Sequence, residues 1–66
     1  MEIVVNGQSR ELPDGCRVPD MLEALGLGRA ACAVEINRAL VRKADHAGTT
    51  LTPGDRVEIV TLVGGG

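Results

Sequence analysis

The stretch Glu2-Ile3-Val4-Val5-Asn6-Gly7 decides how the predicted fold begins. Its three consecutive β-branched residues favour an extended strand. Asn6-Gly7 is the dipeptide that most readily supplies the two positive φ angles of a two-residue hairpin turn. The next segment, Gln8-Ser9-Arg10-Glu11-Leu12, predicts a polar second strand with Leu12 as its anchor, ended by the turn sequence Pro13-Asp14-Gly15. The chain therefore begins with a β-hairpin.

Apolar residues at helical spacing follow the hairpin. They are Val18, Met21, Leu22 and Leu25, at positions i, i+3, i+4 and i+7. Pro19 is suited to a first helical turn, and Gly26-Leu27 is typical of a C-terminal cap with its hydrophobic contact. Arg17 stands where Ser or Thr normally supplies the side-chain N-cap, so no side-chain cap is expected. One helix with a single apolar face is predicted here.

The second half of the chain predicts returning strands. Residues 32–37 alternate along the chain in a period-2 pattern, which places Cys32 in the core and not in a catalytic site. The remaining predicted elements are a short strand at Leu40-Val41, one helical turn over 43–47, a tight turn over 52–55 and a last strand over 56–62. A hairpin, one helix and returning strands form an α+β pattern in which the helix covers one face of the sheet.

Composition narrows the classes of function. The 66 residues suffice for one small domain with a thin core, so an enclosed active site is not expected. The sequence has no Phe, Tyr or Trp, which are the usual platforms for stacking bases, and its net charge is -2. Because duplex binding depends on Lys and Arg neutralising phosphates, we expect no nucleic-acid partner.

The cysteines and the histidine predict neither a metal site nor a catalytic group. Cys16 and Cys32 have the wrong spacing for a CxxC pair or a zinc cluster, and reduced thiols are favoured because no signal peptide indicates an oxidising compartment. His46 is expected to be a surface or half-buried side chain, not a ligand or base. No apolar run approaches the roughly 18 residues of a membrane span. We expect a cytoplasmic protein that is monomeric when free and does not bind membranes.

The last predicted strand carries a candidate docking surface. Val57 and Ile59 alternate along it with Glu58, Val60 and Leu62, so the second set points outward if the first faces the helix. Exposed apolar residues beside a reactive tail suggest a docking patch, to which we add Val63. Arg56 and Glu58 are candidate polar contacts at its rim, although such charges are usually only solvated.

The sequence ends on Gly64-Gly65-Gly66. Glycine has no Cβ, so this segment can enter a slot that admits only backbone, where a partner enzyme could activate the carboxylate of Gly66. The competing interpretation of the same glycines is a frayed end without function. We expect disorder from Gly64 onward in the free protein, because ordering three glycines costs more chain entropy than a solvated tail recovers.

The order and spacing of these features resemble the ubiquitin-like β-grasp sulfur carriers, specifically those of thiamine biosynthesis. The resemblance covers the whole chain, and the matching stretches are residues 5–7, 18–22, 33–37, 41–42, 51–59 and 63–66. It implies a β-grasp fold of the α+β class, with a mixed four- to five-stranded sheet and one main helix packed across one face. Residues 1–63 would form a single domain and 64–66 a flexible tail. Two departures are Arg17 at the helix start and the lack of an aromatic residue near His46.

The resemblance also implies a reaction cycle centred on Gly66. In such carriers a ThiF-type adenylyltransferase uses ATP to convert the terminal carboxylate to an acyl-adenylate, and a persulfide sulfur donor then turns it into a thiocarboxylate. The thiocarboxylate passes its sulfur to thiazole synthase. Gly64 and Gly65 would give the tail access to the adenylation channel. The carrier would be a protein cosubstrate with no catalytic residue and no permanently bound cofactor, since the ATP belongs to the partner.

Three alternatives remain open at this stage. The small subunit of molybdopterin synthase uses the same thiocarboxylate, although it tends to carry aromatic and proline residues before its glycines, where this chain has Ile59-Val60-Thr61-Leu62-Val63. A ubiquitin-like modifier would form covalent adducts with target proteins. A non-reactive β-grasp binding module would tolerate replacement of Gly66.

Overall fold

The structure of the chain is a computed structural model that describes residues 1–62. Five strands form one mixed sheet in the order β2-β1-β5-β3-β4. The strands are β1 (Glu2–Val5), β2 (Gln8–Glu11), β3 (Cys32–Ile36), β4 (Ala39–Val41) and β5 (Arg56–Thr61). The central pair, β1 and β5, is parallel, whereas the other three pairs are antiparallel. The α+β prediction of a four- to five-stranded mixed sheet is therefore confirmed.

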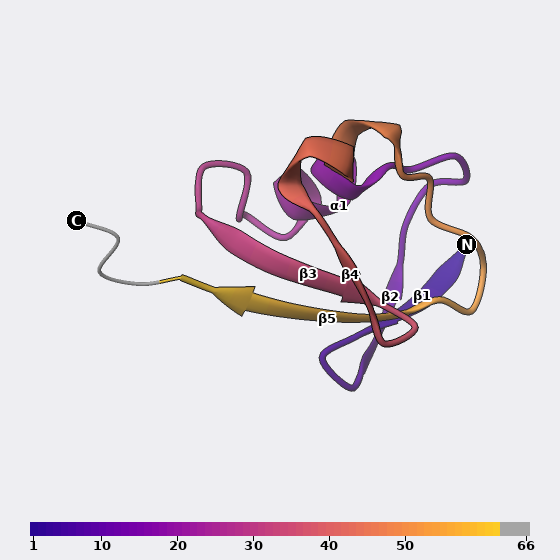
Figure 1. Ribbon diagram of the computed structural model, residues 1–66. Coiled ribbons are helices and arrows are strands. Elements are labelled where there is room, and N and C mark those ends of the chain that lie inside the picture. The colour runs from indigo at the N-terminus through magenta and orange to yellow at the C-terminus, as the bar shows by residue number, and fades with distance from the viewer. Residues whose placement is uncertain (63–66) are drawn as a thin grey trace.

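Helix α1 (Val18–Ala24) and the short 3₁₀ helix η1 (Lys43–Gly48) lie together on one side of this sheet (Figure 1). No helix in the described part of the chain covers the other side. The sheet thus has one face packed on helices and one face bare. Among residues 1–62, no helix is both long enough and apolar enough to cross a membrane.

Both antiparallel hairpins turn through two residues with positive φ. Asn6 and Gly7 have φ values of 49° and 81°, as the Asn-Gly dipeptide predicts for the β1–β2 turn. Asn37 and Arg38, with φ values of 51° and 71°, connect β3 to β4 in the same way. Arg38 is costly in this left-handed region because its Cβ approaches the backbone, so the second turn must be held by contacts elsewhere.

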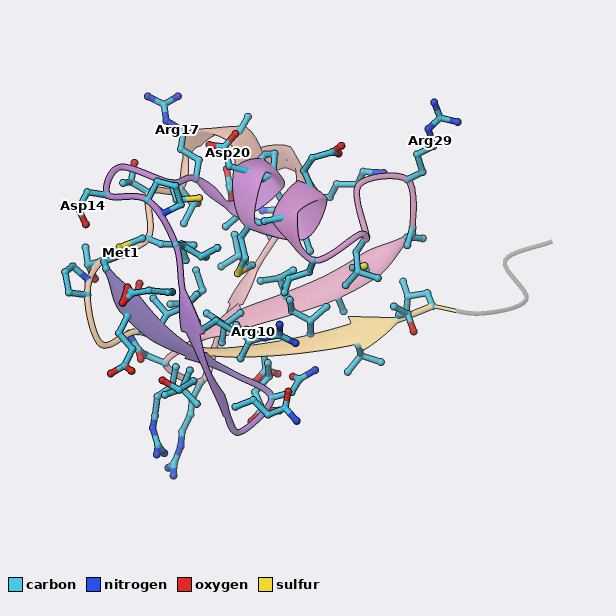
Figure 2. All side chains as sticks on the ribbon, turned by 180° about the vertical axis from the view of Figure 1, so that it is seen from behind. Met1, Arg10, Asp14, Arg17, Asp20 and Arg29 are labelled. Atoms are coloured by element: carbon cyan, nitrogen blue, oxygen red, sulfur yellow. The ribbon has the colours of Figure 1, made fainter. Side chains whose placement is uncertain are left out.

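A side-chain carboxylate stabilises the start of the helix, and backbone hydrogen bonds close its end. At its start the Arg17 N–H donates to the Asp20 carboxylate at 3.0 Å, and the two residues lie together in Figure 2. The side chain of the N-cap residue Arg17 makes no cap hydrogen bond, as predicted. At its end the Leu27 N–H donates to the Leu22 carbonyl and the Gly26 N–H to the Glu23 carbonyl, with Gly26 at a φ of 75°. This pattern is a Schellman motif, so the predicted glycine cap is confirmed.

The core lies between α1 and the covered face of the sheet. Its most deeply buried side chains are at most 2% exposed, and they come from the helix, from three strands and from the loop before β5. They are Ile3, Val18, Met21, Val34, Leu51 and Val57. Leu12 lies one residue beyond β2 and is still buried, so the predicted second strand is one residue too long but its anchor is correct.

The predicted exposure of His46, at the surface or half-buried, was wrong. Its side chain is only 9% exposed, because η1 packs against α1 and turns this residue inward. The ring Nε2 lies 3.1 Å from the Val41 carbonyl, which can only accept, so Nε2 carries the proton and donates. His46 therefore ties η1 to the end of β4.

Candidate functional site

Strand β5 alternates between the core and solvent as its sequence predicts. Val57 and Ile59 are 2% and 8% exposed on the helix side of the sheet. On the bare side, Val60 is 59% exposed. Leu62, one residue beyond the strand, is 56% exposed and borders a cavity that Leu22 and His46 line on the helix side. Two large apolar side chains therefore stand in water near the end of the described chain, as the docking interpretation requires.

Two asparagine side chains hold β5 in place. The Asn6 side-chain oxygen accepts from the Ile59 N–H at 2.8 Å, and its Nδ2 donates to the Ile59 carbonyl at 3.1 Å. At the other end of the strand the Asn37 side-chain oxygen accepts from the Arg56 N–H at 3.0 Å. Each asparagine sits in a hairpin turn at positive φ, which is where this residue is best tolerated. The two turns thereby fix the position of the strand that leads to the glycines.

A buried carboxylate closes the turn before β5. Asp55 is 8% exposed and accepts from the Thr52 N–H at 2.8 Å and the Thr52 hydroxyl at 2.9 Å. Asn37 Nδ2 donates to the same carboxylate at 3.1 Å, which links this turn to the β3–β4 hairpin. These bonds explain how Arg38 is held in the left-handed region. The turn at 52–55 was predicted, whereas the role of Asn6, Asn37 and Asp55 in orienting β5 was not, because their partners lie far away in the sequence.

The end of β5 stays in register with β3. Thr61 pairs with Cys32, and the Leu62 N–H donates to the Ala31 carbonyl at 2.8 Å. Strand β5 ends at Thr61, one residue before the predicted end. The hydrogen bond from Leu62 to Ala31 continues the antiparallel pairing of β5 with β3 by one more residue. The predicted site residues Val63, Gly64, Gly65 and Gly66 lie outside the described residues.

The bare face of β5 also carries charge. Arg56 and Glu58, the predicted rim residues, are both exposed. The β3–β5 register places Glu35 directly opposite Glu58, and the β3–β4 register places Leu40 opposite Glu35. Glu35 and Leu40 were not predicted as site residues, because only the pairing of β3 with β5 and β4 brings them to this surface.

The thiols show no sign of a reactive centre. Cys16 and Cys32 are both free, which agrees with the preference for reduced thiols. Burial, followed by the negative charge of Asp20, raises the pKa of the Cys16 thiol and so disfavours the nucleophilic thiolate. Cys32 and the buried His46 line a cavity of about 620 Å³ beside Leu62. No group of three or more potential metal ligands occurs within residues 1–62.

Comparison with known proteins agrees with this geometry. The model of the ThiS family matches residues 3–66. The crystal structure of the thiamine biosynthesis protein ThiS from Geobacter metallireducens superimposes with a TM-score of 0.84 at 30% identity, covering 100% of both chains. A solution structure of a thiamine biosynthesis protein from the same organism gives 0.80 at 29% identity, covering 100% of this chain and 88% of that one.

Two longer proteins also contain a region similar to this chain. Thiazole synthases from Paramagnetospirillum magneticum and Magnetococcus marinus are 36% and 32% identical to it over 66 residues. The match covers 100% of this chain but 20% of each of those proteins, so the chain spans about a fifth of the length of these curated relatives.

Proposed function

The chain belongs to the ThiS family of thiamine-biosynthesis sulfur carriers, and we propose on that premise that Gly66 carries the sulfur as a terminal thiocarboxylate. The observation that carries the proposal is the extent of the family match, which runs through residue 66 and so includes the glycine run. The β-grasp body would then serve to present this run to partner proteins.

The chemistry proposed for Gly66 has three steps. A carboxylate oxygen attacks the α-phosphate of ATP and expels pyrophosphate, which turns a poor electrophile into an acyl-adenylate. A persulfide sulfur displaces AMP, and reduction of the new S–S bond by a thiol leaves the thiocarboxylate. ATP would be bound and the steps catalysed by partner enzymes, so this chain would contribute no catalytic side chain.

The residues of this chain would have two roles: the glycines would let the tail reach the active site of the partner, and the exposed residues near the end of β5 would contact its surface. Gly64 and Gly65 would pass through a channel that admits only backbone, since neither has a Cβ. Val60 and Leu62 would be covered by the partner, because both are large apolar side chains that are more than half exposed at the end of the described chain. Arg56 and Glu58 would make polar contacts at the rim of the bare face of β5, and Val63 would extend its apolar part toward the tail.

Two kinds of partner follow from the proposal. A ThiF-type adenylyltransferase, supplied with sulfur by a persulfide donor, would load the carrier. A thiazole synthase would unload it, and the thiazole synthases that contain a region similar to this chain support that pairing. A region similar to this chain and the rest of a thiazole synthase share one polypeptide there, as expected if this chain works with such an enzyme.

The test is the intact mass of the chain after incubation with the adenylyltransferase, ATP and a persulfide donor. Exchange of one carboxylate oxygen for sulfur adds roughly 16 Da, and fragmentation should place it on Gly66. Gly65→Ala should slow adenylate formation about 100-fold, because a misplaced carboxylate loses its alignment with ATP. Gly48→Ala is the matched control, since a Cβ there meets nothing within 4 Å. An unmodified mass, or equal rates for both variants, would refute the carrier role.

Three further readouts separate the alternatives. A ubiquitin-like modifier should appear in covalent adducts with other proteins. A molybdopterin synthase subunit should acquire the same mass but fail to support thiazole formation. A passive binding module should keep its partners when Gly66 is replaced by alanine.

A further inference from the structure

One amine and one thiol lie beside the residue from which the glycine tail starts. Lys43 is the only lysine in the sequence. The cavity of about 620 Å³ on the helix side of the sheet is lined by Lys43 of η1, by Cys32 of β3 and by Leu62. The Leu62 N–H donates to the Ala31 carbonyl at 2.8 Å, which holds this last described residue against the loop before β3. Residues 63–66 are therefore attached at the rim of a cavity that contains two nucleophiles.

The four residues after Leu62 are long enough to bring Gly66 to either nucleophile. A sphere with the volume of this cavity is about 11 Å across, whereas four extended residues span roughly 13–14 Å. Glycines also allow the backbone to turn back, because they tolerate φ angles that other residues avoid. The carbonyl carbon of Gly66 can therefore reach any part of the cavity lining, including the Lys43 amine.

The N-terminal amine of Met1 lies far outside this range. The Glu2 carbonyl accepts from the Gly54 N–H at 2.8 Å, so Met1 lies beside the turn before β5. Leu62 lies at the other end of β5, which rises about 3.3 Å per residue, so roughly 20–25 Å separate the two ends. Figure 2 shows Met1 and Arg29, another residue of the cavity lining, at opposite ends of the molecule. Lys43 is therefore the one amine of the chain that the tail can reach.

The Lys43 amine is free of ion pairs in the described part of the chain, because both ion pairs there use the N-terminal ammonium. His46 lies three residues later in η1, and residues i and i+3 share one face of a 3₁₀ helix. Its Nε2 donates to the Val41 carbonyl, so its Nδ1 keeps a free lone pair. No buried side-chain nitrogen or oxygen within residues 1–62 lacks a hydrogen-bond partner, so Nδ1 is open to the cavity that His46 lines. A proton acceptor thus lies on the same face of η1 as the amine.

We propose that Lys43 is an internal acceptor for the activated tail, and that an acyl-adenylate which meets no persulfide closes the chain through an isopeptide bond between Lys43 and Gly66. The lysine nitrogen forms a bond to the Gly66 carbonyl carbon. The bond from that carbon to the adenylate oxygen breaks, AMP leaves with the electron pair, and the proton of the amine passes to His46 or water. Ring closure withdraws from the cycle a carrier that was activated without sulfur. This inference rests on the proposed function, which supplies the adenylate.

The Cys32 thiol lines the same cavity and leads to the same product. If its sulfur attacks first, it expels AMP and forms a thioester with Gly66. A neighbouring amine then takes over the acyl group and sets the thiol free, so the amide on Lys43 is the stable end of both routes. A short linker holds its two ends at an effective concentration in the millimolar range. At micromolar concentrations of carrier, closure within one chain should therefore outrun reaction with the lysine of another.

The test is incubation with the ThiF-type adenylyltransferase and ATP in the absence of a persulfide donor. Loss of one water lowers the intact mass by roughly 18 Da, and fragmentation should join Lys43 to Gly66. Lys43→Arg keeps the charge but removes the nucleophile, so this product should fall at least about tenfold. In the Lys43→Arg background, Arg29→Lys returns an amine to the cavity and should restore the product. Arg38→Lys is the matched control, since it places the amine about 20 Å from Cys32 along β3 and should restore nothing.

The outcomes distinguish ring closure from the carrier function. A chain that gains sulfur when the donor is present but never loses water in its absence would overturn the ring closure alone. A dehydrated product that persists in Lys43→Arg, or that hydroxylamine reverses as it would a Cys32 thioester, would show that Lys43 is not the acceptor. Equal restoration by Arg29→Lys and Arg38→Lys would refute the role of the cavity. Absence of both mass changes would refute the carrier function itself.

Discussion

The side-chain amide of Asn6 takes the place of a strand residue opposite Ile59. It accepts from the Ile59 N–H and donates to the Ile59 carbonyl, at 2.8 Å and 3.1 Å, as a backbone neighbour in a sheet would. The parallel pairing of β1 with β5 reaches only Val5 and Val57, so Asn6 adds one more step to it. A turn residue thereby supports the strand that leads to the proposed docking surface.

Replacing this amide should loosen β5 without disturbing the turn. Asn6→Gly keeps a residue that tolerates positive φ but removes both hydrogen bonds, so the free energy of unfolding should fall by about 1–2 kcal/mol. Urea unfolding measures that loss, and amide exchange locates it. The Ile59 amide should exchange faster in the variant, whereas the Val34 amide in the neighbouring strand should respond only to the global change. Unaltered protection of Ile59 would contradict this account.

The buried carboxylate of Asp55 should matter more to stability than an exposed one. Asp55→Ala leaves the Thr52 N–H and the Asn37 amide without their acceptor, so we expect a loss of about 2–3 kcal/mol in the free energy of unfolding. Asp45→Ala, at an exposed aspartate in η1, is the matched control and should stay within about 0.5 kcal/mol of the wild type. Comparable losses for both variants would refute the structural role of Asp55.

Stability should fall at alkaline pH because of the N-terminal amine. The Met1 ammonium donates to the Leu12 carbonyl at 2.6 Å and lies 3.1 Å from Asp14, beside which Figure 2 shows it. The hydrogen bond to Asp14 is the main cause that raises the pKa of this amine above its ordinary value of 8.0, and the nearby charges of Asp14 and Glu11 add to it. A raised pKa in the folded state means that the stabilisation is complete below pH 8.0 and is lost as pH rises through the folded value.

Melting temperature recorded from pH 7 to pH 10 checks this expectation. Asp14→Asn should flatten the decline, since it removes the main cause of the shift in the pKa of the amine. Because the groups involved are exposed, the change should be small and should shrink further at high salt. If the melting temperature of Asp14→Asn fell with pH as much as that of the wild type, the loss of stability would come from another titrating group.

The two thiols should react at different rates. Burial raises the pKa of Cys16, so at pH 8 it holds less thiolate than an ordinary cysteine and is also hidden from reagents. Cys32 is only half-buried and lines a cavity. In the folded chain iodoacetamide should therefore label Cys32 at least about ten times faster than Cys16, and urea should abolish the difference. Peptide mapping after timed labelling reads both rates, and equal rates in the folded chain would contradict the observed burial.

The exposed apolar residues of β5 should serve binding and not stability. Val60→Ser should lower kcat/KM for adenylation about tenfold, as truncation of a buried interface residue does, while the free energy of unfolding changes by less than about 0.5 kcal/mol. Ala39→Ser is a control at an exposed position of β4 that pairs with Ile36, on the helix side of the sheet. Adenylation should not respond to it. If Val60→Ser instead lowered the free energy of unfolding by more than about 1 kcal/mol, the lower kcat/KM would reflect a destabilised fold and not a lost contact with the partner.

Features that depend on neighbouring residues were predictable from the sequence. The positive φ angles at Asn6 and Gly7, the cap at Gly26 and the in-and-out alternation along β5 all occur as expected. Each follows from backbone sterics or from side-chain periodicity over a few residues, and neither needs a distant partner. The fold class followed from the order of such local features.

Only the tertiary structure decided which distant residues meet. The bonds of Asn6 to Ile59 and of Asn37 to Arg56 join segments far apart in the chain, and the burial of His46 depends on how η1 packs against α1. Glu35 and Glu58 come face to face because β5 inserts between β1 and β3 in one particular register. Spacing along the sequence determines which residues lie on each face of a strand. Strand order and register are set by the collective burial of one core. Only this register places the carboxylates of Glu35 and Glu58 side by side on the bare face of the sheet.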